Sequence, residues 1–135
     1  MPLAIVIADI DAFKAYNDTL GHPEGDKCLV AVANVIRNVA SRAGDFAARY
    51  GGEEFIVLIP GLDREAATAY AEMLRRACES GAIPHPASPV GPIVTISLGV
   101  AVCVPSEQAS VAALVAGADA ALYRAKKEGR NRVNN

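Results

Sequence analysis

The chain has 135 residues, 52% of them hydrophobic, and a formal net charge of −2, which suits one compact domain with a full core. Its 13 Lys and Arg are scattered and form no basic stripe, so a nucleic acid polymer is not expected as a partner. Charge, Gly or Pro interrupts every apolar run. We therefore expect a cytoplasmic domain without direct membrane contact, either free or as the cytoplasmic part of a larger, membrane-bound protein.

The first predicted element is a strand at residues 3–8, where nearly every side chain is apolar. Such a run is typical of a strand buried on both faces. It ends abruptly at Asp9-Ile10-Asp11. We expect a polar loop rich in Asn, Asp, Gly and Pro to follow, and then an amphipathic helix over residues 25–42, which carry apolar side chains at helical spacing.

A hairpin follows, formed by residues 46–50 and 55–59 around Gly51 and Gly52. Glycine supplies the positive φ that tight hairpin turns need. Two acidic residues, Glu53 and Glu54, are expected to project from the tip of this hairpin.

The rest of the chain predicts a helix opened by Asp63 and closed by Gly81, a strand at residues 93–104 and a last helix at residues 110–127. Ser110 is the expected N-cap of that last helix. The order β-α-β-β-α-β-α indicates an α+β fold, a ferredoxin-like split βαβ arrangement with a mixed sheet and helices packed on one face.

Right-handed crossovers in that fold place the first strand beside the hairpin, so Asp9 and Glu53 are expected to meet at one edge of the sheet. Mg²⁺ takes about six oxygens but only one or two protein carboxylates, and the remaining positions go to water and substrate phosphates. We therefore expect a Mg²⁺ site, with Mn²⁺ as an alternative ion, and a nucleotide substrate. The alternative is that acids on an exposed turn are simply solvated.

Several separate segments, taken in order, resemble the GGDEF family of diguanylate cyclases. They are residues 9–18 (DIDAFKAYND), 21–26 (GHPEGD), 51–55 (GGEEF) and 118–131 (ADAALYRAKKEGRN). The resemblance covers nearly the whole chain. It implies condensation of two GTP molecules into cyclic di-GMP with release of pyrophosphate, in a homodimer whose two domains each hold one GTP.

The resemblance also implies roles for individual residues. Glu53 is the expected base and Lys14 the residue that stabilises phosphate charge; the metal ligands are Asp9, Glu53 and the carbonyl of Ile10. The substrate-binding residues are Asn17 and Asp26 for guanine, His22 near the nucleotide, the backbone at Ala12 and Phe13, and Lys126 and Arg130 for the β and γ phosphates.

Some of these residues have plainer alternatives. Lys126 and Arg130 could be cations that only favour a helix C-terminus. Asp11 could be structural, and Glu54 is given no role. A carboxylate bound to a metal is a poor base, so the metal itself could acidify the attacking hydroxyl instead of Glu53.

A second ligand site is suggested by Arg42-Ala43-Gly44-Asp45, which fits the inhibitory RxxD motif of the family. The resemblance implies that Arg42 and Asp45 bind the product, cyclic di-GMP. The alternative is a surface ion pair of little energetic consequence. The family often supplies a further arginine from the next helix, where Met73 stands in this chain.

The resemblance implies that residues 1–135 are an excised catalytic domain. We expect the upstream helix and turn of the family, and a sensor or receiver domain, to be missing. Other functions remain open: a regulatory module that binds GTP or cyclic di-GMP without turnover, or a structural interaction domain. Adenylate cyclase or polymerase-palm activity would share the metal chemistry, but Asn17 with Asp26 favours guanine.

Overall fold

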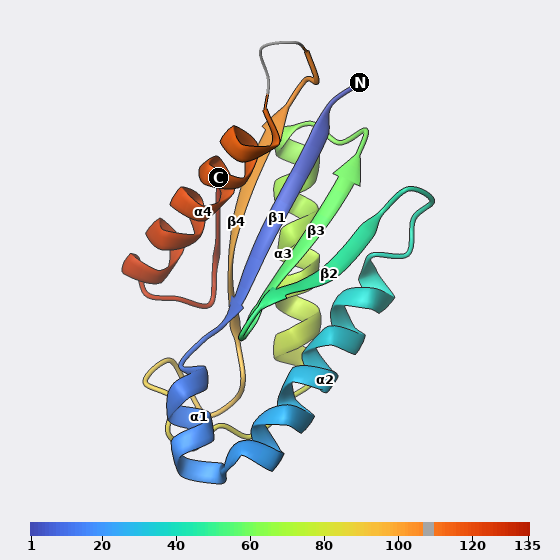
Figure 1. Cartoon of the computed structure of the whole chain (residues 1–135). Coiled ribbons are helices and arrows are strands. Elements are labelled where there is room, and N and C mark those ends of the chain that lie inside the picture. Colours follow the sequence, from blue (N-terminus) through green and yellow to red (C-terminus); the bar gives the residue numbers. More distant parts are fainter. Residues whose placement is uncertain (107–109) are drawn as a thin grey trace.

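The structure, a computed structural model, describes residues 1–106 and 110–135. Its core is a mixed sheet with the strand order β2-β3-β1-β4-β5 (Figure 1). The elements in chain order are β1 (Leu3–Ile10), α1 (Phe13–Leu20), α2 (His22–Val39), β2 (Phe46–Gly51), β3 (Glu54–Pro60), α3 (Arg64–Ser80), β4 (Ile96–Cys103), α4 (Val111–Lys127) and β5 (Val133–Asn134). The predicted α+β class and the predicted position of the first strand beside the hairpin are confirmed.

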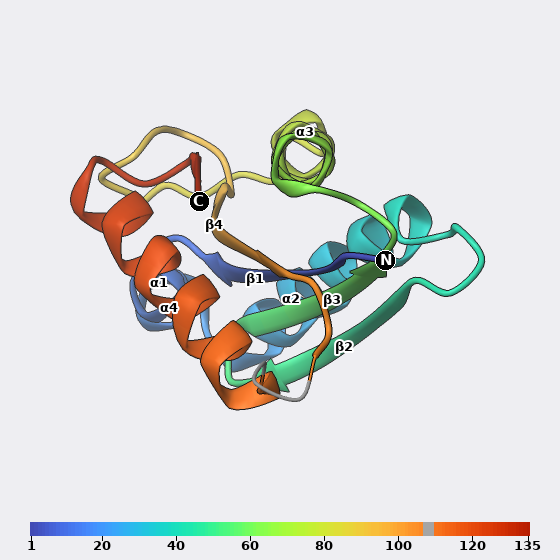
Figure 2. The ribbon, with the colours of Figure 1, turned by 90° about the horizontal axis from the view of Figure 1, so that it is seen from above.

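Helices cover both faces of this sheet, and the expectation of helices on one face was wrong. One face of β1, with Val6, packs in the larger core cluster with side chains of α2 and α3. The other face, with Ile5 and Ile7, packs against Leu114 and Leu122 of α4. Figure 2 shows α3 and α4 on opposite sides of the sheet. The physical reason is in the strand itself, because an uninterrupted apolar run needs cover on both sides.

The segment after β1 also differs from the prediction, since it forms helix α1 where a polar loop was expected. Phe13 and Tyr16, three residues apart, are buried on one side of this helix and anchor it to the core. Gly21, with φ 91°, then separates α1 from α2, and α2 begins at His22 rather than at residue 25. The apolar positions of α1 were too few to show a helical period.

Most other boundaries agree with the sequence to within two residues, but α2 ends at Val39 rather than at residue 42 and β4 begins at Ile96 rather than at residue 93. The Asp63 side chain accepts a hydrogen bond from the Ala66 N–H at 2.9 Å, and Ser110 Oγ accepts one from the Ala113 N–H at 3.0 Å, so both predicted helix starts are confirmed. The two-residue strand β5 was missed because it is too short to show a pattern. No helix among the described residues is long and apolar enough to cross a bilayer.

Candidate functional site

The end of β1 opens into a cavity of about 180 Å³. The register pairs Asp9 with Glu54 of β3 and with Ser97 of β4. Asp9 therefore lies beside the hairpin turn. The cavity is lined by Asp9, Ile10, Asp11, Ala12, Phe13, Lys14, Glu53, Lys126 and Arg130. Every residue predicted to hold metal or phosphate is in this set.

The hairpin turn is fixed to β1 by its backbone. Ile10 N–H donates to the carbonyl of Glu53 at 3.3 Å. Gly52 supplies the left-handed conformation that the turn requires, with φ 50°. Glu53 therefore sits in the turn and lines the cavity, whereas its neighbour Glu54 is the residue paired directly with Asp9.

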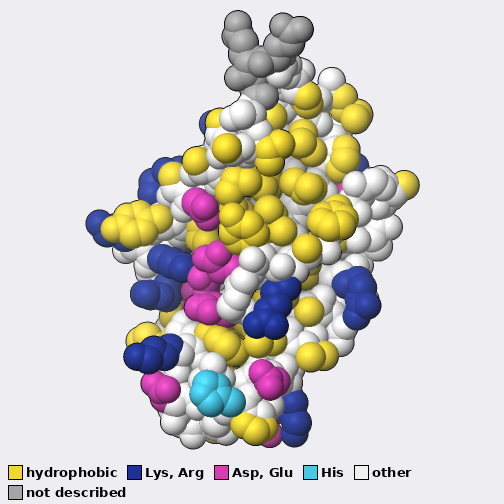
Figure 3. All heavy atoms as spheres, in the orientation of Figure 1, with side chains coloured by type: hydrophobic (Ala, Val, Ile, Leu, Met, Phe, Trp, Pro, Cys, Tyr) yellow, Lys and Arg dark blue, Asp and Glu magenta, His cyan; other side chains and the backbone are white. Residues whose placement is uncertain are grey.

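Asp9 is a buried carboxylate, 5% exposed, and its Oδ2 lies 2.6 Å from Lys126 Nζ. Burial raises the pKa of Asp9 to about 6; the Lys126 ammonium opposes that rise, while Glu53 and Glu54 add to it. Lys126 thus offsets only part of the cost of burying the ionised Asp9 carboxylate. In Figure 3, acidic side chains gather beside basic ones on this face of the molecule.

This donor set fits a divalent cation. Asp9 and Glu53 line one small cavity together with the Ile10 backbone, which offers the hard oxygens that Mg²⁺ prefers. Within residues 1–106 and 110–135, no group of three or more His, Cys, Asp or Glu side chains is placed to hold a metal. Mg²⁺ does not need one, since it takes one or two carboxylates and completes its shell with water and phosphate.

Other groups that line the cavity suit phosphate. Ala12 precedes α1 with a left-handed backbone, φ 54° and ψ 38°, and makes no side-chain cap. The first N–H groups of the helix are therefore left for another acceptor. Lys14 lies on this helix, and Arg130 comes from the turn after α4 with φ 64°. Cations and backbone donors thus line the same cavity as the two acids.

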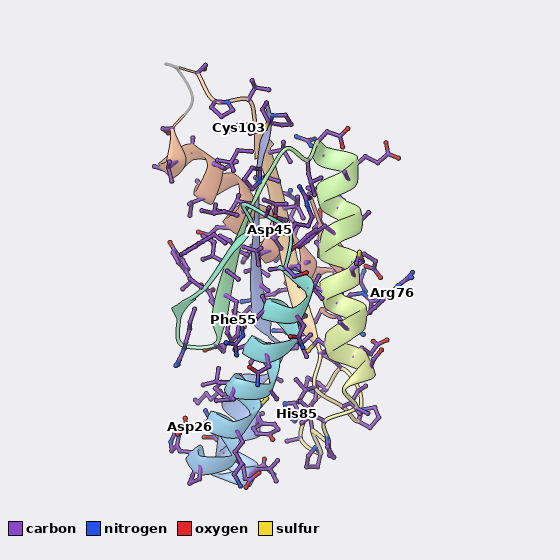
Figure 4. The ribbon with its side chains drawn as sticks, turned by 90° about the vertical axis from the view of Figure 1, so that its right-hand side faces the viewer. Asp26, Asp45, Phe55, Arg76, His85 and Cys103 are labelled. Atoms are coloured by element: carbon purple, nitrogen blue, oxygen red, sulfur yellow. The ribbon has the colours of Figure 1, made fainter. Side chains whose placement is uncertain are left out.

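The predicted guanine residues lie outside this cavity, on α1 and α2. Asn17 Oδ1 is buried and has no hydrogen-bond partner within the protein. It abuts Gly25, where an added Cβ would lie 1.7 Å from that oxygen. Asp26 and His22 are exposed near the start of α2 (Figure 4). Helices α1 and α2 therefore present polar groups outside the cavity that could form hydrogen bonds with a nucleobase.

Comparison with known proteins agrees with this geometry. The model of the family described as "Diguanylate cyclase, GGDEF domain" matches residues 1–132. The chain belongs to the GGDEF family. Diguanylate cyclase A of Treponema denticola is 44% identical over 97% of the chain, which spans 34% of that relative. The probable diguanylate cyclase DgcT of Escherichia coli is 42% identical over 98% of the chain, which spans 29% of it.

Solved GGDEF structures share the fold. The GGDEF domain of DgcB from Caulobacter crescentus, in complex with c-di-GMP, superposes with a TM-score of 0.87 at 38% identity, covering 98% of this chain and 77% of that one. The active GGEEF domain of a diguanylate cyclase from Vibrio cholerae superposes with a TM-score of 0.84 at 34% identity, covering 99% and 82%. The family resemblance drawn from the sequence is thus confirmed.

In this GGDEF domain the two RxxD residues lie in the turn between α2 and β2, but only Arg42 is presented to solvent. The side chain of Asp45 is 0% exposed. Its Oδ2 accepts from Tyr70 OH at 3.0 Å and from Arg42 N–H at 3.3 Å, while its Oδ1 has no hydrogen-bond partner. Burial, with Asp45 beside it, raises the pKa of Tyr70. Met73 is exposed on α3.

Sequence reasoning left one part of the site without a function. Asp11 is 2% exposed, and it accepts hydrogen bonds from Thr95 Oγ1 at 2.8 Å, Ser97 Oγ at 2.6 Å and the Asn131 N–H at 3.0 Å. Asn131 follows Arg130, so the Asp11 carboxylate holds in place the segment after α4 that brings Arg130 to the cavity. The second acid of the Asp9-Ile10-Asp11 segment was the signal that could have found it.

The same segment is also tied to α3. Arg75 Nη1 donates to Asn131 Oδ1 at 3.0 Å, and Asn131 Nδ2 donates to Glu79 Oε2 at 2.7 Å. Arg75 in turn contacts Glu72 and Glu79. Arg130 and Asn131 both have positive φ, a conformation that residues other than glycine adopt when the surroundings hold them. The hydrogen bonds of Asn131 with Arg75 and Glu79 keep the segment in this conformation.

Proposed function

We propose that this GGDEF domain is a diguanylate cyclase that condenses two GTP into cyclic di-GMP and pyrophosphate with Mg²⁺, in the cytoplasm where GTP is available. The observation that carries the proposal is the cavity at the end of β1. Two acids, Asp9 and Glu53, line it together with Lys14, Lys126 and Arg130. That is the charge pattern of a metal–triphosphate complex.

Asp9, Glu53 and the carbonyl of Ile10 would hold the ion. When bound, Mg²⁺ would neutralise triphosphate charge and make the attacked phosphorus more electrophilic. Lys126 and Arg130 would bind the β and γ phosphates, and Lys14 would stabilise charge that develops on the α-phosphate. The backbone N–H groups at Ala12 and Phe13 would complete this phosphate cradle.

Bond formation requires a partner. The 3′-hydroxyl of each GTP attacks the α-phosphate of the other, so two P–O bonds form, two pyrophosphates leave, and two copies of the domain must face each other. Glu53 would accept the hydroxyl proton unless the metal acidifies the hydroxyl directly. Asn17 and Asp26 would select guanine, through an amide donor for O6 or N7 and a carboxylate acceptor for N1–H and N2–H₂. His22 would lie near the base.

The product would also bind at a second site, through Arg42 and Asp45, and inhibit the enzyme. The exposed guanidinium of Arg42 supports this role, because it can form paired hydrogen bonds with guanine or phosphate. Asp45 would have to exchange its Tyr70 hydroxyl for a guanine N–H. Arg42→Ala should weaken product inhibition while Arg37→Ala, an exposed arginine on α2, leaves it unchanged. Equal inhibition in all three proteins discards the assignment.

The test of the activity is mass-spectrometric detection of cyclic di-GMP after the concentrated domain is incubated with GTP and Mg²⁺. Glu53→Gln should abolish the product, whereas Glu65→Gln, an exposed acid on α3, should not. Product that persists in Glu53→Gln overturns the role of Glu53. If the wild-type chain binds GTP but forms no product even as a forced dimer, the domain is a binding module instead.

A further inference from the structure

One buried histidine next to the site takes no part in the mechanism above. His85 lies in the loop between α3 and β4 and is 1% exposed (Figure 4). Its Nε2 lies 3.0 Å from the carbonyl oxygen of Ala12. Its Nδ1 is buried without a hydrogen-bond partner. Its ring meets the Tyr16 ring edge-on, with the centroids 5.1 Å apart.

The hydrogen bond fixes the tautomer of His85. A carbonyl oxygen can only accept, so Nε2 must carry a hydrogen and donate it, while Nδ1 has no hydrogen-bond partner. Burying a polar atom without a partner has a free-energy cost. A phenylalanine would fill the same apolar space without that cost. The histidine is therefore useful at this position for its N–H.

The loop presents this N–H rigidly. The backbone N–H of His85 donates to the carbonyl of Pro92 at 2.9 Å, and Val94 N–H donates to the carbonyl of Ile83 at 2.8 Å. Pro84 and Ile93 form an isolated bridge. The two arms of the loop are thus paired, and the imidazole is held against the start of α1.

The acceptor is the carbonyl of Ala12, a residue that lines the cavity and has a strained backbone. Ala12 has φ 54° and ψ 38°, a left-handed conformation that is strained for a residue with a Cβ. Its carbonyl accepts two hydrogen bonds, from Tyr16 N–H at 3.1 Å and from His85. These two donors compensate for the strain and fix the direction of the carbonyl.

Fixing that carbonyl also fixes a donor. The peptide between Ala12 and Phe13 is planar and trans, so the Phe13 N–H points opposite to the Ala12 carbonyl. As part of the first turn of α1, this N–H has no partner within the helix. Ala12, Phe13 and Lys14 all line the cavity. The hydrogen bond from His85 to the Ala12 carbonyl thus also sets the direction of the Phe13 N–H at the other side of the same peptide.

We propose that His85 is a positioning residue for the phosphate cradle, acting through the Ala12–Phe13 peptide. The inference rests on the proposed function in one respect only, that the cavity binds the phosphates of Mg·GTP. It predicts that loss of the His85 N–H weakens binding of the phosphates and not of the guanine, because the guanine residues lie on other turns of α1 and α2.

The test compares His85→Phe, which keeps a ring against Tyr16 but has no donor, with His85→Gln, which keeps a donor. Calorimetry measures Mg·GTP binding, and NMR titration measures guanosine binding. We expect His85→Phe to weaken Mg·GTP about tenfold, the order of one lost hydrogen bond, with guanosine unchanged and His85→Gln close to wild type. Equal Mg·GTP affinity in all three proteins, or equal losses for both ligands in His85→Phe, overturns the proposal.

A second measurement needs no variant. In the wild-type chain the ¹⁵N shifts of His85 should show hydrogen on Nε2; an Nε2 without hydrogen overturns the proposal even if His85→Phe does not fold. Failure of the proposed function looks different, because the wild-type chain would then not bind Mg·GTP at all. Adding Ala12→Gly to His85→Phe should recover part of the affinity, because glycine adopts the left-handed conformation without strain.

Discussion

Lys126 Nζ lies 2.6 Å from Asp9 Oδ2, which joins the last turn of α4 to the end of β1 across 117 positions of the chain. The lysine proposed to bind phosphate and the aspartate proposed to bind metal thus hold each other in the ligand-free domain. Mg·GTP would separate them and give each a new partner of opposite charge. The pair keeps both groups at the cavity and limits the electrostatic cost of an empty site.

The electrostatic cost of the buried Asp9 carboxylate that Lys126 does not offset should be relieved in Asp9→Asn. Burial raises the pKa of Asp9 from 3.8 to about 6, so the folded chain favours the protonated acid more than the unfolded chain does. That stabilisation is complete below pH 4 and is lost as pH rises through 6, and at pH 8 the ionised group costs about 3 kcal/mol. In EDTA at pH 8, urea unfolding should show Asp9→Asn to be more stable than wild type.

Two comparisons sharpen this experiment. Asp119→Asn, on the exposed side of α4, should leave the free energy of unfolding unchanged at every pH. Added Mg²⁺ should stabilise the wild-type chain and not Asp9→Asn. A less stable Asp9→Asn in EDTA at pH 8 would mean that the attraction of Lys126 outweighs the burial of the carboxylate.

Asp11→Asn should release the tail that carries Arg130. The carboxylate accepts three hydrogen bonds, from Thr95, Ser97 and Asn131, and an amide would turn N–H donors toward some of these donors. We expect a loss of about 1–3 kcal/mol in stability and a higher KM for Mg·GTP. In a double-mutant cycle, Arg130→Ala should add little to the KM of Asp11→Asn. Additive effects would show that Asp11 does not act through Arg130.

The sequence predicted those parts of the molecule whose pattern is local. The apolar run of β1, the glycine turn before Glu53 and the N-caps Asp63 and Ser110 are each encoded within a few residues, and the structure has all of them. Helix α1 was missed because Phe13 and Tyr16 provide only one turn of apolar spacing. The position of α4 was missed because a helix pattern shows which side is apolar but not which face of the sheet that side covers.

The candidate site shows the same division. Glu53 and Asp9 were predicted together because strand order follows from topology, and the cavity contains both. The contacts of Asp45 with Tyr70 and of His85 with Ala12 join residues 25 and 73 positions apart. Neither partner shows in its own segment what it will meet. Such contacts depend on side-chain packing, which no periodicity encodes.

Tyr70→Phe should test how Asp45 is held. The tyrosine hydroxyl donates to Asp45 Oδ2 at 3.0 Å, and the carboxylate already has one oxygen without a hydrogen-bond partner. Removing the hydroxyl leaves a buried charge with one donor fewer, so urea unfolding should show a loss of about 1–3 kcal/mol. Tyr123→Phe is the matched control, because Tyr123 is 60% exposed. Equal effects of the two substitutions would show that the hydroxyl of Tyr70 does not stabilise Asp45.

Gly99→Ala should move α4 and, with it, Lys126. An added Cβ at Gly99 of β4 would lie 2.1 Å from the Ala118 carbonyl oxygen and 2.3 Å from the Leu122 nitrogen. Both are backbone atoms of α4, so the helix cannot yield by rotating a side chain and must shift away from the sheet. We expect a loss of about 1–3 kcal/mol, as for other overpacked cores.

The functional effect follows from the place of Lys126 near the end of α4. A displaced helix carries Lys126 away from the cavity that it lines, so KM for Mg·GTP should rise in Gly99→Ala. Gly91→Ala is the control, because nothing lies within 4 Å of an added Cβ there and its φ is not positive. Urea unfolding and steady-state kinetics measure the two effects. Stability and KM in Gly99→Ala that match those of Gly91→Ala would show that α4 can move off β4 at no cost and that its contact with Gly99 does not position Lys126.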